Sequence, residues 1–232
     1  MNKRITIAID GFSSTGKSTL AKKLANKLGY VYVDTGAMYR AIALYAMDNG
    51  LIEEEIIDKN GLIRSLDHIE LIFKHNADIG FSEMFLNGEN VESQIRSIEV
   101  SNLVSKVAAI SAVRKKMVAQ QHSMGLDQGI VMDGRDIGTV VFPKAELKLF
   151  MTASAEIRAK RRFEEMIEKG DDVSYDAVLD NVITRDYLDT TRKDSPLVQA
   201  SDAIEIDSNT LNVEETFNLA YKLAIGKIEK PK

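Results

Sequence analysis

Residues 11–18 read Gly-Phe-Ser-Ser-Thr-Gly-Lys-Ser, a pattern whose residue types suit the binding of phosphate groups. Gly11 and Gly16 free the backbone to wrap its N–H groups around phosphate oxygens, and Lys17 can reach the β- and γ-phosphates of a nucleotide. The hydroxyl of Ser18 can ligate Mg²⁺ at a helix N-terminus, which itself favours anions. The sequence therefore predicts a nucleoside triphosphate site, and this binding by itself does not say what is done with the nucleotide.

A second segment that can do chemistry is residues 34–40, Asp-Thr-Gly-Ala-Met-Tyr-Arg, which directly follows an expected strand. In a parallel sheet this turn lies on the same rim as the phosphate loop. Thr35 can cap the next helix, and Arg40, roughly one turn into that helix, can fork onto a phosphate. A capped strand-to-helix corner without a ligand is the alternative reading.

The third segment is residues 132–138, Met-Asp-Gly-Arg-Asp-Ile-Gly, again at the end of an expected strand. Asp133 is placed to hold the hydration shell of Mg²⁺, and Arg135 can contact phosphate. Asp136 can accept hydrogen bonds from a base or a sugar. The alternative is a turn whose charges pair internally.

Arginines gather in the C-terminal third of the chain. Arg158, Arg161 and Arg162 share one expected helix face, and Arg185 and Arg192 flank Asp189. A run of charges is often only a solvated face, but phosphoryl transfer needs mobile cationic groups on the donor and acceptor phosphates. The break at residues 170–172 would let the two arginine-bearing helices close as a lid.

Strand and helix patterns alternate along the chain, which is typical of a parallel sheet covered on both faces. The predicted fold class is α/β, a five-stranded parallel sheet with flanking helices, a small antiparallel β insert at about 68–91 and a helical lid. The expected strands are 5–10, 30–33, 130–133, 147–151 and 203–206, and the expected helices are 17–28, 36–48, 97–123 with a break near Ser111, 154–169, 174–189 and 213–228, the last capped by Asn212 or Asn209.

Composition restricts the class of protein. The chain has 232 residues, a net charge of -5, no cysteine and no long apolar span. These features predict a soluble, cytoplasmic protein with one core, and they argue against a disulfide framework, a membrane partner and a nucleic acid partner.

Taken together, the motifs resemble those of bacterial cytidylate kinases of the long type, which are P-loop nucleoside monophosphate kinases. The resemblance covers nearly the whole chain and rests on residues 9–18, 34–40 and 133–143, and on Arg185-Asp186 followed by Asp189 and Arg192. It implies transfer of the γ-phosphoryl group of Mg·ATP to CMP or dCMP, which gives ADP and CDP or dCDP. It also implies one kinase domain over 1–232, with the phosphate loop at 11–19, a monophosphate-binding region at 35–115 and the lid at 154–172.

The resemblance also assigns roles to single residues. It implies that ATP is bound by Gly11, Phe12, Ser13, Ser14, Thr15, Gly16, Lys17, Ser18 and Thr19 with Arg161 and Arg162, and that the monophosphate is bound by Thr35, Arg40, Ser105, Arg114, Arg135, Asp136, Arg185, Asp189 and Arg192. The implied catalytic residues are Lys17, Arg135, Arg158, Arg185 and Arg192. Mg²⁺ is expected on Ser18 directly and on Asp133 through water. Phe12 stands where the family often has Pro, and Thr35 replaces a frequent Ser.

Two other classes of function share the phosphate loop. A GTP-driven switch would also carry an Asn-Lys-x-Asp motif, which the sequence lacks. A kinase for another acceptor, such as shikimate or a different nucleoside monophosphate, would replace the set around Thr35, Asp136 and Asp189. The acceptor is itself a phosphate oxygen anion, so no catalytic histidine is expected, and a monomer is expected.

Overall fold

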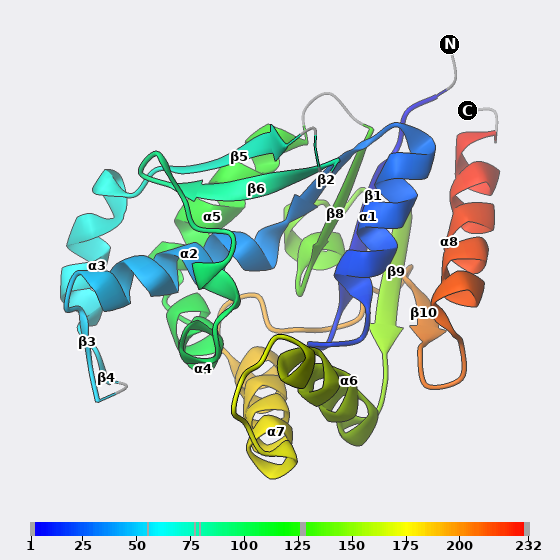
Figure 1. Cartoon of the computed structure of the whole chain (residues 1–232). Helices are drawn as coiled ribbons and strands as arrows, with labels where there is room; N and C mark the ends of the chain where they lie inside the picture. Colours follow the sequence, from blue (N-terminus) through cyan, green and yellow to red (C-terminus); the bar gives the residue numbers. More distant parts are fainter. Residues whose placement is uncertain (1–2, 55, 77, 79, 126–128, 230–232) are drawn as a thin grey trace. The chain divides into compact units, whose positions relative to one another are not determined.

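The computed structural model describes residues 3–54, 56–76, 78, 80–125 and 129–229. The chain forms two compact units (Figure 1). Unit 1 combines residues 1–32 with 125–232, and unit 2 consists of residues 33–124.

The main sheet has five strands in the order β10-β9-β1-β8-β2. Their bounds are Thr6–Gly11 for β1, Val31–Asp34 for β2, Ile130–Gly134 for β8, Leu147–Thr152 for β9 and Ile204–Asp207 for β10. The strand β1 is buried along its whole length and pairs in parallel with β8 and β9, and β10 pairs in parallel with β9. Such a doubly covered central strand needs side chains that are apolar on both faces, as its sequence provides.

The register of these strands brings the motifs to one edge of the sheet. Ile9 lies opposite Asp133, Asp10 lies opposite Gly134, and Gly11 lies opposite Met151. The phosphate loop and the 132–138 turn therefore leave the sheet next to each other, at the carboxyl ends where parallel sheets bind ligands.

Four α-helices and the π-helical turn Ile137–Val141 complete the described part of unit 1, and the α-helices are α1 (Lys17–Leu28), α6 (Ala155–Glu168), α7 (Tyr175–Thr191) and α8 (Val213–Ile228). Figure 1 shows α1 and α8 side by side along the sheet, and Leu20 and Leu24 of α1 and Ala220 of α8 join its core. The α8 helix begins at a capping box between Asn212 and Glu215, which confirms Asn212 as the cap. The helices α6 and α7 pack against each other as a hairpin.

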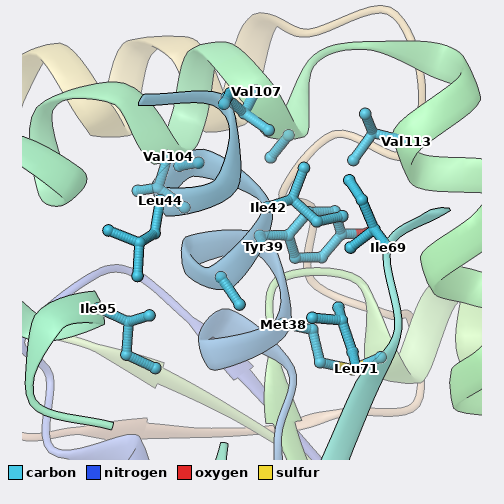
Figure 2. Packing of buried hydrophobic residues seen from close by; sticks show 14 of the residues in the cluster. Met38, Tyr39, Ile42, Leu44, Ile69, Leu71, Ile95, Val104, Val107 and Val113 are labelled. Carbon is cyan, nitrogen blue, oxygen red and sulfur yellow. The ribbon is translucent and has the colours of Figure 1, made fainter. Parts of the chain in front are cut away.

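Unit 2 is built on α2 (Thr35–Asp48), α4 (Ile98–Ala108) and α5 (Ser111–Met124). Its remaining elements are the short strands β3 (Ile52–Glu53) and β4 (Ile56–Ile57), the helix α3 (Lys59–Ser65), the 3-10 turns Leu66–His68 and Gln94–Arg96, and the antiparallel strands β5 (Leu71–Asn76), β6 (Phe81–Leu86) and β7 (Glu89–Asn90). Figure 2 shows its separate core, in which Met38, Tyr39 and Ile42 of α2 lie near Ile69 and Leu71.

The five-stranded sheet and the small antiparallel sheets confirm the predicted fold class. The break near Ser111 is confirmed because α4 ends at Ala108 and α5 begins at Ser111. Asn87 and Gly88 both have positive φ, as their hairpin turn requires. The strand expected from residue 68 begins only at Leu71, because the residues before it close a 3-10 turn instead. The hairpin β3–β4 and the helix α3 were not predicted.

No helix in the described ranges has both the length and the apolar character that crossing a bilayer requires.

Gly11 is required by the fold. Its φ is +143°, and a Cβ atom placed on it would lie 2.1 Å from the carbonyl oxygen of Met151. We expect Gly11→Ala to lower the free energy of unfolding by roughly 3 kcal/mol or more, because strained backbone and a steric overlap add. Gly29→Ala is the control, since Gly29 also has positive φ but open space around it, and we expect it to cost about 1 kcal/mol. Urea unfolding measures both, and equal losses would contradict the steric argument.

Candidate functional site

The phosphate loop adopts the conformation that its sequence predicts. Gly11, Ser14 and Gly16 have positive φ values of 143°, 57° and 90°, so the chain curls between β1 and α1. Gly16 is the N-cap of α1 and has no side chain to cap the helix. The first N–H groups of α1 are therefore available to an anion, which the helix dipole also attracts.

Lys17 is buried inside this loop, with 5% of its surface exposed. Its Nζ donates to the Phe12 carbonyl oxygen and, at 3.4 Å, to Thr15 Oγ1. Burial lowers the pKa of the ammonium group to about 7, and the positive charge of Arg135 adds to this effect while Asp133 opposes it. The charge of Lys17 is thus poorly compensated, which favours an incoming phosphate.

Asp133 and Ser18, the two residues predicted to serve Mg²⁺, are in contact with each other. Ser18 Oγ donates to Asp133 Oδ2 at 2.9 Å, and Tyr32 OH donates to Asp133 Oδ1 at 2.8 Å. The described residues include no group of three or more His, Cys, Asp or Glu side chains that could hold a metal ion by themselves. One hydroxyl and one carboxylate suit Mg²⁺, which keeps several waters and takes its other ligands from nucleotide phosphates.

Asp10, at the end of β1, holds the neighbouring turn. Its carboxylate accepts from the backbone N–H groups of Ile137 and Gly138 at 2.8 and 2.7 Å. Burial raises the pKa of Asp10 to about 6, although these two hydrogen bonds lower it. The carboxylate therefore anchors the π-helical turn Ile137–Val141, which immediately follows Arg135 and Asp136.

The residues of unit 1 that were predicted to bind the monophosphate form one cluster. Asp189 Oδ2 accepts from Arg135 Nε at 2.9 Å, and Asp189 Oδ1 accepts from Arg192 Nη1 at 3.3 Å. Arg192 also lies 4.0 Å from Asp136 Oδ1. Burial acts to raise the pKa of Asp189, but the guanidinium groups of Arg135, Arg185 and Arg192 hold that pKa below its usual value. The structure thus brings together five of the residues that the sequence proposed.

The three arginines of α6 do not behave alike. Arg158 is buried, and its guanidinium group forks onto Asp186 of α7 at 3.0 and 2.5 Å. Arg161 is exposed and donates to the side chain and carbonyl of Ser208. Arg162 is half-buried. Arg158 also contacts the phosphate loop, through a 3.4 Å hydrogen bond to the Ser13 carbonyl.

In unit 2, Asp34 organises the start of α2. Its carboxylate accepts from Ala37 N at 2.9 Å, from Arg40 Nη2 at 2.9 Å and from Arg96 Nη2 at 3.0 Å. Burial would raise its pKa, but the two guanidinium groups hold it well below the usual range. The expectation that Thr35 caps the helix is wrong, because Asp34 is the N-cap and Thr35 is the first helical residue.

The other two predicted residues of unit 2 are buried in its helices. Ser105 of α4 and Arg114 of α5 are each 3% exposed. Arg114 donates to the Ala108 carbonyl at 3.1 Å, and its guanidinium group lies 5.2 Å from the ring centre of Tyr39. These contacts fix the orientation of Arg114.

A family model described as cytidylate kinase matches residues 7–225. The chain belongs to the cytidylate kinase family. It is 66% identical over 221 residues to a cytidylate kinase from Flavobacterium johnsoniae, covering 95% of this chain and 96% of that protein. It is 62% identical to a cytidylate kinase from Flavobacterium psychrophilum, covering 95% and 98%. A solved gluconokinase from Sinorhizobium meliloti is similar at 12% identity and a TM-score of 0.47, covering 99% of this chain and 96% of that one.

The sequence analysis gave no role to three carboxylates and one phenol that the structure places at the site. Asp10, Asp34 and Asp186 anchor backbone or arginine groups, and Tyr32 holds Asp133. Asp10 and Asp34 were signalled by their position at the ends of apolar strands, directly before glycine-containing turns. The only sequence feature that pointed to Asp186 is its place among other charged residues, next to Arg185. No sequence feature pointed to a role for Tyr32.

The buried charge of Lys17 predicts a pH-dependent cost in stability. The pKa of Lys17 falls from its ordinary value of 10.5 to about 7 in the folded protein, so the unfolded chain binds more protons between these pH values. The free energy of unfolding therefore rises with pH across this window, as the penalty for burying the charged form of Lys17 is relieved. At pH 7 we expect Lys17→Met to be more stable than the wild type by roughly 2 kcal/mol.

Urea unfolding between pH 6.5 and 9.5 measures this difference, which should narrow as the pH rises. Lys23→Met is the matched control, because the Lys23 side chain on the same helix is 45% exposed and should show no such trend. A Lys17→Met variant that is less stable than the wild type at pH 7 would contradict the cost assigned to burial.

Proposed function

We propose that the protein transfers the γ-phosphoryl group of ATP to CMP or dCMP, forming CDP or dCDP and ADP. The observation that carries this proposal is the cluster of Arg135, Arg185 and Arg192 on Asp189, in the same unit as a complete phosphate loop. Membership of the cytidylate kinase family supports the choice of acceptor.

On the donor side, residues 11–19 bind the phosphates of ATP, with Arg161 and Arg162 as further ATP-binding residues. The backbone N–H groups of the loop donate hydrogen bonds to the phosphate oxygens, and Lys17 exchanges the Phe12 carbonyl for the β- and γ-phosphates. Phosphate oxygens are stronger partners for an ammonium group than a carbonyl oxygen is, so binding also restores the charge of Lys17.

The site also suits Mg²⁺ bound with ATP. Ser18 would supply an oxygen ligand and Asp133 would act through water, while Tyr32 orients Asp133. The ion would neutralise charge on the phosphate oxygens as ATP binds.

The transfer itself needs no general base, because the attacking group is already an oxygen anion of the acceptor phosphate. A bond forms between this oxygen and the γ-phosphorus, and the bond from the γ-phosphorus to the bridging oxygen of ADP breaks. Lys17, Arg135, Arg158, Arg185 and Arg192 stabilise the charge that spreads over the transferred oxygens.

Each unit contributes residues that we assign to binding of CMP or dCMP. In unit 1, Arg135 and Arg192 bind the acceptor phosphate, and Asp189, held by Arg185, reads the sugar. In unit 2, Thr35 and Arg40 serve the acceptor, and the base is read by Ser105 together with Arg114. Asp136 is a further acceptor-binding residue.

The same proposal includes a mobile segment and a location in the cell. Segment 154–172 closes as a lid over ATP, which would exclude water and limit hydrolysis. We further propose that the protein is cytoplasmic, because the chain has no cysteine that would signal an oxidising compartment. We also propose that it is a monomer.

The proposal is tested by coupled ADP release with Mg·ATP and each of CMP, dCMP, UMP, AMP, GMP and shikimate. We expect turnover with CMP and dCMP, and a loss of at least ~10³-fold in Lys17→Ala, because this variant lacks a charge at the transferred phosphoryl group. A preference for AMP, GMP or shikimate would replace the proposed acceptor. Near-normal turnover in folded Lys17→Ala would refute the ATP site.

Base selection gives a separate prediction. Cytosine and uracil differ in the hydrogen-bonding groups of their pairing edge, which a buried hydroxyl can distinguish. We expect Ser105→Ala to lower the ratio of kcat/KM for CMP over UMP by about tenfold, while the KM for ATP stays the same. Ser101→Ala is the matched control, since Ser101 is also buried in α4, one turn earlier. An unchanged CMP-to-UMP ratio in Ser105→Ala would remove Ser105 from this role.

A further inference from the structure

The guanidinium group of Arg158 is enclosed on its edges and on one face. It is 3% exposed, and its edges donate to Asp186, to the Ala153 carbonyl at 2.9 Å and to the Ser13 carbonyl at 3.4 Å. Its central carbon lies 5.1 Å from the ring centre of Phe12. A desolvated cation at this distance from an aromatic ring is held more strongly than an exposed one.

The ring of Phe12 is itself held in place. It meets Phe150 of β9 edge to face, with ring centres 6.3 Å apart and planes at 77°. The backbone carbonyl of the same residue accepts from Lys17 Nζ and from Thr15 Oγ1. Phe12 is therefore anchored to the sheet by its side chain and to the phosphate loop by its backbone.

These contacts form a continuous connection within unit 1. It runs from Phe150 in the sheet through Phe12 to Arg158 of α6, and then through the bidentate ion pair to Asp186 of α7. The ring of Phe12 is the part of the phosphate loop that lies against the face of this guanidinium group. A proline at position 12 would offer Arg158 no aromatic face.

We propose that Phe12 is a positioning residue for phosphoryl transfer, whose ring orients the Arg158 guanidinium group and couples the phosphate loop to the α6–α7 hairpin. The proposal rests on the proposed function, since it assigns Phe12 an effect on the same reaction. Because Phe12 acts through Arg158, its removal should lower kcat while the affinity for ATP, which the loop backbone supplies, changes little.

The test compares Phe12→Leu, Phe12→Met and Phe12→Tyr with the wild type in the coupled assay with Mg·ATP and CMP. We expect kcat to fall about tenfold in the Leu and Met variants, with KM for ATP within about twofold, and to be retained in the Tyr variant. Phe163→Leu is the matched control, because Phe163 is also half-buried in α6 and its ring packs edge to face on Tyr175 of α7. A fall in kcat of the same size in Phe163→Leu would overturn the proposal.

A double-mutant cycle examines the route of the effect. In an Arg158→Lys background, which keeps the charge but loses the planar group, Phe12→Leu should lower kcat by less than about twofold. Independent effects, in which the two losses multiply, would show that Phe12 does not act through Arg158.

A measurement without substrate separates this proposal from the assignment of the reaction. A proton over an aromatic ring resonates upfield, so the NMR signal of the Arg158 side-chain N–H should move downfield in Phe12→Leu and stay in place in Phe163→Leu. An unmoved Arg158 signal in Phe12→Leu would overturn the contact. If the wild type failed to phosphorylate CMP while the Arg158 signal still moved in Phe12→Leu, the proposed function would be wrong and the contact between Phe12 and Arg158 would stand.

Discussion

Burial of positive charge is the constraint on which the rest of unit 1 depends. Removing a guanidinium or ammonium group from water costs several kcal/mol unless charged partners or hydrogen bonds compensate. Arg158, Arg185 and Arg192 are each at most 9% exposed, and the carboxylates of Asp186 and Asp189 lie among them. The sheet edge can thus present cations to phosphate because acidic side chains hold those cations in the folded chain.

Lys17 is treated differently from the arginines. Its described partners are a carbonyl and a hydroxyl, and burial lowers its pKa to about 7. The protein therefore carries a partly uncompensated charge at the position where the transferred phosphoryl group is proposed to lie. Such a cost in stability at a functional position is expected, because groups chosen for chemistry are not chosen for packing.

Aspartates at or near strand ends organise the polypeptide around the motifs. Asp10 fixes two N–H groups of the 137–141 turn, Asp34 caps α2 and pairs with two arginines, and Asp133 receives Ser18 and Tyr32. In each case a short carboxylate accepts hydrogen bonds that the backbone or a polar neighbour would otherwise lack. The proposed phosphate-binding residues depend on these anchors for their position.

The sequence by itself determined the elements whose signals are local. Apolar runs predicted the five parallel strands, the glycines of residues 11–16 predicted the curled loop, and Asn87-Gly88 predicted the hairpin turn, because each depends on neighbouring residues and backbone sterics. Position in the chain also indicated which motifs share one rim of the sheet, since parallel strands carry their carboxyl ends to the same side.

Only the tertiary structure decided which charged groups pair. Asp189 and Arg135 are 54 positions apart and Arg158 and Asp186 are 28 apart, so no spacing rule links them. The same structure showed that Arg158 points inward while Arg161 is exposed, although both belong to one helix with a repeating charge pattern. Pairing and burial depend on how separate elements pack, and local sequence carries no record of those distances.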